Sequence, residues 1–268
     1  MEDLSDMLEP ITVFDKTTDE GCDIKKRYDT YIENIQPILA KYSWFITPST
    51  DFRLWYYISQ NISKQADPED FLNRVFVYFF SVFNFENLNY MVERWEVFSM
   101  LDTRFPILKE CVNILKDSAS KNSNIKNPHY VIIPALIAQI DGLKNDIFEY
   151  CKSRKMDFEG RNIDKKSQKI NISKLFENRY NPETAKILPF VCECLLKDCT
   201  AANDLLFDSL FQTAKHNDKM ENLKPPFSRH KIMHGQYLEY GTLENTIRLF
   251  LLIDFLAEMK DTMERIKL

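Results

Sequence analysis

The sequence predicts an all-α protein, and three observations support that prediction. Apolar residues recur at intervals of three and four along most of the chain, which places them on one face of a helix. The 268 residues include only 5 glycines, too few for a fold with many tight turns between strands. Prolines or capping residues stand before several of the apolar runs, as they do at helix starts.

The first 123 residues are predicted to form an N-terminal helical region, which serves either as a packing extension or as a regulatory part. Residues 1–22 carry seven acidic side chains against one basic side chain, which is typical of a peripheral arm. Apolar residues then recur at helical spacing over residues 23–42. Pro37 lies inside this run and is expected to kink the helix.

Two further helix starts can be predicted from local chemistry. Ser49 or Thr50 is expected to cap the helix that follows, since a hydroxyl can accept from the free N–H groups of a first turn. Asp67 followed by Pro68 is a second start, because proline fits the first helical position. The apolar stretch from Val75 to Phe85 is about half the length needed to cross a bilayer, so we expect a buried helix there.

Residues 84–117 keep a helical period, and Pro106 is expected to kink or divide that segment. Residues 118–128 are rich in Ser, Lys and Asn and form the best candidate for a linker. We therefore predict a boundary after residue 123, with a helical bundle over residues 124–268.

Two long helices are expected within this C-terminal region. The first covers residues 130–151, where Gly142 costs about 1 kcal/mol relative to Ala and therefore needs a reason, such as the close approach of another helix. The second starts at Thr242, a good capping residue, and runs to about residue 266. Its apolar surface exceeds one stripe, so neighbouring helices or a second subunit must cover it.

Charge limits the possible partners. The formal net charge of −5 excludes a generally basic nucleic-acid binder, so any RNA site must be local. Residues 152–174 hold eight bases against three acids, including Lys165 and Lys166. This exposed segment either contacts phosphates or is simply well solvated, and the sequence leaves both interpretations open.

The segment from Arg229 to Gly235 has the strongest functional pattern. Pro225 and Pro226 precede it, and the glycine suits the left-handed position past a helix end, which predicts a short helix ending at His234. Arginine offers a planar charged fork for phosphate, and histidine can move a proton near neutral pH. The same residue types are also common on any exposed short helix, so this pattern alone does not decide.

Arg229 and His234 resemble the R-x4-6-H signature of the HEPN superfamily, in particular a bacterial branch related to defence and abortive infection. The resemblance includes Gly235, the Tyr240-Gly241-Thr242 turn and the apolar helix after it. It extends more loosely upstream to about Met91, through Trp95, Arg104 and the run from Pro134 to Gly142. It does not reach the first ninety residues.

The resemblance implies a HEPN-like helical bundle that dimerises and acts as a metal-independent endoribonuclease of the toxin or antiviral-defence type. Arg229, His234 and His230 would be catalytic, with no cofactor and no metal. Asp141 matches an acidic position that faces the Arg/His pair, and Tyr240 would support the motif. RNA contacts would come from Lys231, Lys144, Lys165 and Lys166.

Other functions fit the same resemblance. The domain could be an inactive HEPN module for dimerisation or nucleotide binding, or a toxin held by an antitoxin or activating partner. In some HEPN toxins a tyrosine two residues after the histidine is modified, whereas Tyr237 lies three after His234. The 6 cysteines fit no standard zinc spacing, so we expect free thiols, a cytoplasmic location and no membrane segment.

Overall fold

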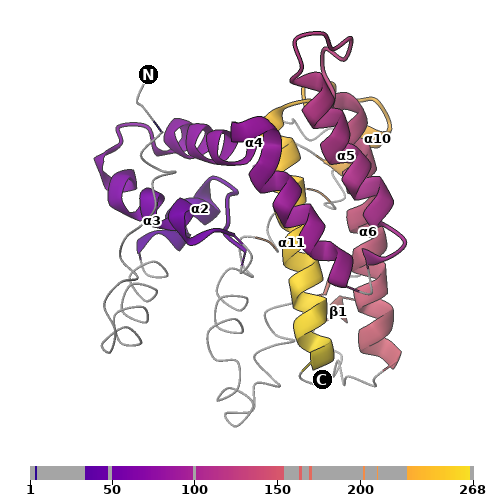
Figure 1. Ribbon diagram of the computed structural model, residues 1–268. Helices are drawn as coiled ribbons and strands as arrows, with labels where there is room; N and C mark the ends of the chain where they lie inside the picture. Colours follow the sequence, from indigo (N-terminus) through magenta and orange to yellow (C-terminus); the bar gives the residue numbers. More distant parts are fainter. Residues whose placement is uncertain are drawn as a thin grey trace.

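The computed structural model describes most of the chain outside its N-terminal arm and the segment before the motif (Figure 1). The described residues are 34–47, 50–98, 101–153 and 228–265, with the isolated positions Leu4, 163–164, 169–170, Ala202 and Leu210. The long elements in this part are all helices, so the predicted all-α class is confirmed. The helices are α2 (Gln36–Lys41), α3 (Phe52–Asn61), η3 (Ile62–Lys64), α4 (Pro68–Arg94), η4 (Trp95–Val97), α5 (Phe105–Ser118), α6 (His129–Ser153), α10 (Arg229–Met233) and α11 (Leu243–Arg265).

Helix α11 is the centre of the described structure. It runs beside α6 and also packs against α4, while α5 packs against both α4 and α6 (Figure 1). Residues 245–260 of α11 are all buried. The prediction that neighbouring elements cover this helix is therefore confirmed, and they do so within one chain.

The described part of the N-terminal region shares its hydrophobic core with α11. Phe45, which follows α2, packs edge-on against Phe255, with ring centroids 6.2 Å apart. Trp95 stacks on Phe250 and donates its indole N–H to the buried carboxylate of Asp254 at 2.6 Å. These contacts tie the segment after α2 and the start of η4 to α11, while the boundary after residue 123 stays a prediction.

Two predicted helix starts have different outcomes. The carboxylate of Asp67 accepts from the N–H groups of Glu69 and Asp70 at 3.1 Å, so the predicted cap of α4 is confirmed. The predicted cap of α3 is wrong. Asp51 caps that helix by accepting from the Arg53 N–H at 2.8 Å, whereas Thr50 is engaged with Thr47. A carboxylate directly before the helix is an equally good acceptor and is one residue closer.

Two of the prolines that were expected to bend or divide helices stand at helix starts instead. Pro37 and Pro106 both lie in the first turn, of α2 and α5 respectively, where a missing N–H costs nothing. Most of the run before Pro37 lies outside the described residues, so the expected kink in that run stays a prediction.

The real bend occurs in α4, inside the stretch that we expected to be one buried helix. Val82 leaves the helical region, and Phe83, Asn84 and Phe85 have positive φ values between 52° and 63°. The side-chain amide of Asn87 donates to the freed carbonyl of Phe79 at 2.7 Å. Phe83 is exposed at this bend, so the prediction of a continuous buried helix to Phe85 is wrong. No helix in the described part is long and apolar enough to cross a membrane.

Candidate functional site

The predicted motif helix is present as α10. His234 stands at its C-cap, and Gly235 follows with a φ of +66°. The Gly235 N–H donates to the Ile232 carbonyl at 3.0 Å, and the Gln236 N–H donates to the Lys231 carbonyl at 2.8 Å. This pair of bonds is the Schellman closure, which requires a left-handed residue after the cap. The predicted end of the helix at His234 is confirmed.

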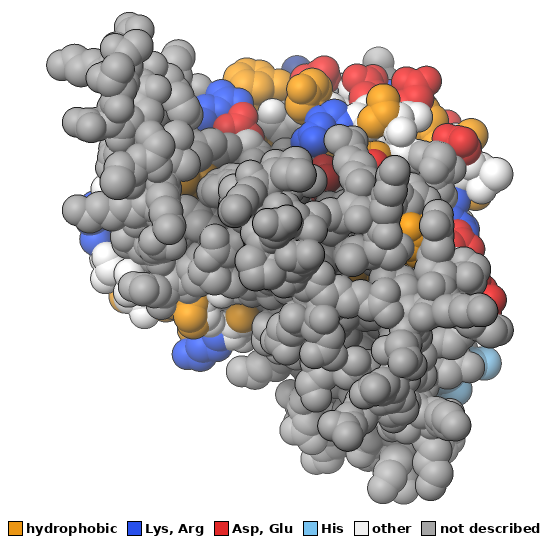
Figure 2. All heavy atoms as spheres, turned by 90° about the horizontal axis from the view of Figure 1, so that it is seen from below, with side chains coloured by type: hydrophobic (Ala, Val, Ile, Leu, Met, Phe, Trp, Pro, Cys, Tyr) orange, Lys and Arg blue, Asp and Glu red, His pale blue; other side chains and the backbone are white. Residues whose placement is uncertain are grey.

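The two motif histidines lie together on the surface. His230 and His234 are four residues apart, and their ring centroids are 4.5 Å apart with an interplanar angle of 54°. Both side chains are exposed. Histidine side chains reach the surface at one edge of the face drawn in Figure 2. The helix end therefore presents two imidazole rings side by side to solvent.

Arg229 reaches from α10 to α6. Its Nη2 lies 3.0 Å from Oδ2 of Asp141, and the arginine side chain keeps 45% of its surface exposed. The other oxygen of the same carboxylate lies 2.9 Å from Nζ of Lys144. Asp141 thus lies beside the motif arginine, as the family resemblance implied. It fixes the direction of Arg229 while leaving much of the guanidinium open to solvent.

The two other candidate residues on this side of the molecule are buried. Lys231 is only 7% exposed, so its ammonium is not offered to RNA in this structure. Tyr240 is buried too, and its hydroxyl donates to the Tyr130 carbonyl at 3.3 Å. The two tyrosine rings meet edge-on with centroids 5.4 Å apart. Tyr240 therefore fastens the segment after α10 to the start of α6.

The turn from Tyr240 to Thr242 positions the start of α11 against α6. A Cβ on Gly241 would lie 2.7 Å from the Tyr130 ring, so a side chain there would displace that ring. The Thr242 hydroxyl accepts from the Asn245 N–H at 3.2 Å, which confirms the predicted cap. The amide of Asn245 in turn donates to the Tyr240 carbonyl at 3.1 Å.

The reason for Gly142 differs from the one we expected. A Cβ at this position would lie 2.5 Å from Nη1 of Arg104, so a side chain and not a neighbouring helix occupies the space. The Arg104 guanidinium crosses α6 here and pairs with Gln139 and Asp146. Arg104 comes from the turn before α5, a long-range contact that helical periodicity does not reveal.

Several predicted features lie outside the described residues. They are Lys165 and Lys166, most of the acidic arm over residues 1–22, and the prolines before α10. The strands β1 (Ile163–Asp164) and β2 (Lys169–Ile170), which flank the two lysines, pair antiparallel with Ile163 opposite Ile170. Among the described cysteines, Cys111 is a free buried thiol, and burial raises its pKa to about 11.

Arg248 is one of several buried charged residues on α11 that the sequence analysis did not single out. Arg248 lies between Ile247 and Leu249 in the most apolar part of α11. A lone arginine inside an apolar run was the available signal, because burying a charge is unfavourable unless something compensates it.

Comparison of the chain with protein-family models, with curated proteins and with solved structures gives no match.

Proposed function

We propose that this protein is a metal-independent endoribonuclease of the toxin or antiviral-defence type, acting at Arg229, His230 and His234. The observation that carries the proposal is the proximity of the two histidine rings, 4.5 Å apart, on an exposed helix end that also bears Arg229. The resemblance of the motif to HEPN ribonucleases gives the same assignment.

RNA cleavage without a metal needs one group to take a proton and another to give one. In the proposed reaction one imidazole takes the proton from a ribose 2′-OH, and the resulting oxygen attacks the adjacent phosphorus. The bond from phosphorus to the 5′ oxygen breaks, and the second, protonated imidazole gives its proton to that oxygen. The products are a 2′,3′-cyclic phosphate and a 5′-hydroxyl end, and exchange with water restores both histidines.

Arg229 supplies the remaining requirement, which is charge stabilisation on phosphorus. A guanidinium fork matches two phosphate oxygens and stays charged throughout the reaction. The ion pair with Asp141 at 3.0 Å holds one edge of that fork, and 45% of the arginine side chain is exposed. Charge stabilisation of this kind is worth most when the donor is oriented before the substrate arrives.

The proposal includes a homodimer. Met233 and Leu238 expose apolar side chains directly before and shortly after His234. A second copy that covers these side chains would bring a second set of Arg229, His230 and His234 to the same cleft. Two sets would also concentrate positive charge in a protein whose formal net charge is −5. An activating or inhibiting partner, if the protein is of the toxin type, would control access to this cleft.

The decisive experiment is cleavage of total RNA by the purified protein in excess chelator. We expect the wild type to cut and to leave 2′,3′-cyclic phosphate ends, and His234→Ala and His230→Ala each to lose about 10²–10⁴-fold in rate. Arg229→Ala should also be inactive while keeping its helical circular dichroism, because the side chain is half exposed. Sedimentation equilibrium of the wild type should give the mass of a dimer.

His129→Gln is the matched control, since this histidine lies at the start of α6 and takes no part in the proposed reaction. It should cut at the rate of the wild type. The proposal is contradicted if the wild type leaves RNA intact, if cutting requires a divalent cation, or if His234→Ala cuts as fast as the wild type.

A further inference from the structure

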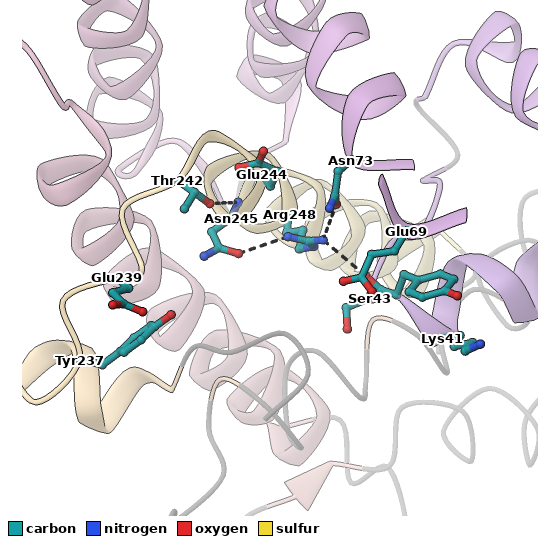
Figure 3. A pocket seen from close by; sticks show the side chains of 11 residues that line it. Lys41, Ser43, Glu69, Asn73, Tyr237, Glu239, Thr242, Glu244, Asn245 and Arg248 are labelled. Carbon is teal, nitrogen blue, oxygen red and sulfur yellow. Dashed lines mark hydrogen bonds between the residues drawn. The ribbon is translucent and has the colours of Figure 1, made fainter. Parts of the chain in front are cut away.

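A pocket of about 260 Å³ lies between the N-terminal helices and the beginning of α11 (Figure 3). One wall comes from the end of α2, the turn after it and the first two turns of α4, with Lys41, Glu69 and Asn73. The opposite wall comes from the segment that joins α10 to α11, with Tyr237 and Glu239. The volume lies just below the range of about 300–1,000 Å³ that is typical of small-molecule sites, so a compact metabolite would fit.

Arg248 lies in this pocket with an unusual set of partners. Its side chain is 6% exposed, and its guanidinium lies over the Trp44 ring at 4.1 Å from the centroid. It donates to the side-chain oxygens of Asn245 and Asn73 at 3.2 and 3.0 Å, and to the Tyr42 carbonyl at 3.5 Å. All of these acceptors are neutral.

Two requirements of the Arg248 guanidinium are unmet. Its Nε is buried and has no hydrogen-bond partner in the described structure. In that same part of the chain, no carboxylate forms an ion pair with it; Glu69 and Glu244 act on it only from a longer distance. Burial lowers the pKa of Arg248 to about 10, which reflects the missing compensation. A buried charge of this kind is normally paired with a charge of opposite sign.

We propose that the pocket binds a small organic anion, whose phosphate or carboxylate group pairs with Arg248. The other side chains that line the pocket indicate which groups the rest of the ligand carries. Glu69, Glu239 and Glu244 line the walls and offer acceptors, so the ligand carries hydroxyl donors, as a sugar phosphate or a sugar acid does. A polyanion is disfavoured, because these carboxylates outnumber the cations Lys41 and Arg248 in the lining.

Binding of a ligand would restrain the segment that follows α10. The Tyr237 N–H donates to the Lys231 carbonyl at 3.2 Å, so one wall of the pocket is hydrogen-bonded to α10. The other wall belongs to α4 and to the turn after α2. A ligand between them would hold both segments together, and it would do so whether or not the protein cuts RNA.

The test is thermal unfolding of the full chain with two matched ligand pairs at millimolar concentration. Ribose 5-phosphate is compared with ribose, and gluconate with glucose, so that each pair differs by the anionic group. We expect at least one anion to raise Tm by about 2–4 °C, and its neutral counterpart to have no effect. The pair that responds distinguishes phosphate from carboxylate.

Two variants examine Arg248 directly. Arg248→Met keeps most of the side-chain volume without the charge, and we expect it to lose the response to the anion without a fall in Tm of the free protein. Asn73→Asp places a carboxylate 3.0 Å from the guanidinium, at the position of the present amide oxygen, and can still accept from the Trp44 indole N–H. It should raise Tm of the free protein and weaken the response to the anion.

Arg74→Met is the control, because this arginine is the next residue on α4 but pairs with Asp70 at the surface. It should keep the full response. The proposal is overturned if neither anion raises Tm of the wild type, or if Arg248→Met responds as the wild type does. It is also overturned if Asn73→Asp lowers Tm of the free protein. That result would mean that the Arg248 charge is already compensated and that its role is only to connect the surrounding helices.

Discussion

The guanidinium of Arg229 and the carboxylate of Asp141 lie 3.0 Å apart and join the short helix α10 to the long helix α6. The position of Asp141 is fixed by a helix of 25 residues, whereas α10 has only 5. The long helix therefore sets the direction of the motif arginine. Lys144 lies on the other oxygen of the same carboxylate, so the carboxylate is held from both sides.

Asp141→Asn tests whether this pair orients Arg229 for cleavage. We expect the rate of RNA cleavage to fall by about ten- to a hundredfold, because a small misplacement of a positioned group has an effect of that size. The free energy of unfolding should change by less than about 1 kcal/mol, since the pair is partly exposed. Asp146→Asn, five residues later on α6, removes a carboxylate that pairs with Arg104 instead and should leave cleavage unchanged. Equal losses in both variants would remove Asp141 from the site.

Gly235→Ala tests the closure of the motif helix. Nothing lies within 4 Å of the added Cβ, so the only penalty is the left-handed backbone at a φ of +66°. We expect the protein to lose about 1 kcal/mol of unfolding free energy, measured by urea denaturation. Gly235→Asn should lose less, because asparagine tolerates this conformation better than alanine. A loss of equal size in both variants would mean that the backbone conformation is not the cause.

Local patterns gave the helix ends correctly where one residue type settles the geometry, as at Asp67, Gly235 and Thr242. They failed where two acceptors competed, because Asp51 caps α3 although Ser49 and Thr50 were expected to. The bend of α4 at Val82 could not be predicted, because no glycine or proline lies there. The pairing of Arg104 with Gly142 and the burial of Arg248 depend on elements far apart in sequence. Such contacts follow from packing, which periodicity does not describe.

The same limit applies to the candidate site. The helix from Arg229 and its end at His234 follow from spacing and from the glycine. That His230 and His234 lie side by side follows from helical geometry, because residues four apart share a face. The burial of Lys231 does not follow, since it depends on how α10 lies on α6. The position of a residue along a helix follows from its sequence spacing. Its exposure depends also on which neighbouring helix packs over it.

His129 should make the stability of the protein depend on pH. Its Nδ1 lies 2.8 Å from the Thr246 hydroxyl, which itself donates to the Thr242 carbonyl, so the imidazole is the donor in this contact. Burial lowers the pKa of His129 below its usual value of 6.5, although Glu244 opposes that shift. Well above pH 6.5 neither the folded nor the unfolded chain carries the proton, and the group has no effect on stability. As the pH falls below that value, the unfolded chain takes up the proton first, so stability decreases until the folded pKa is passed.

Urea denaturation of the wild type and of His129→Gln between pH 7 and pH 5 checks this sign. The free energy of unfolding should fall less steeply with decreasing pH in the variant. If the slopes of wild type and His129→Gln coincide, the burial of His129 does not contribute to the acid response.

Gly142 and Arg104 should be energetically coupled, and a double-mutant cycle measures the coupling. Gly142→Ala alone gains about 1 kcal/mol of helix propensity. The new Cβ, 2.5 Å from Nη1, forces the guanidinium away from Gln139 and Asp146, which removes contacts worth roughly the same amount. We therefore expect little or no net stabilisation in the wild-type background. In an Arg104→Ala background the space is empty, so the same substitution should stabilise by the full amount of about 1 kcal/mol. If Gly142→Ala has the same effect in both backgrounds, the glycine is present for a reason other than Arg104.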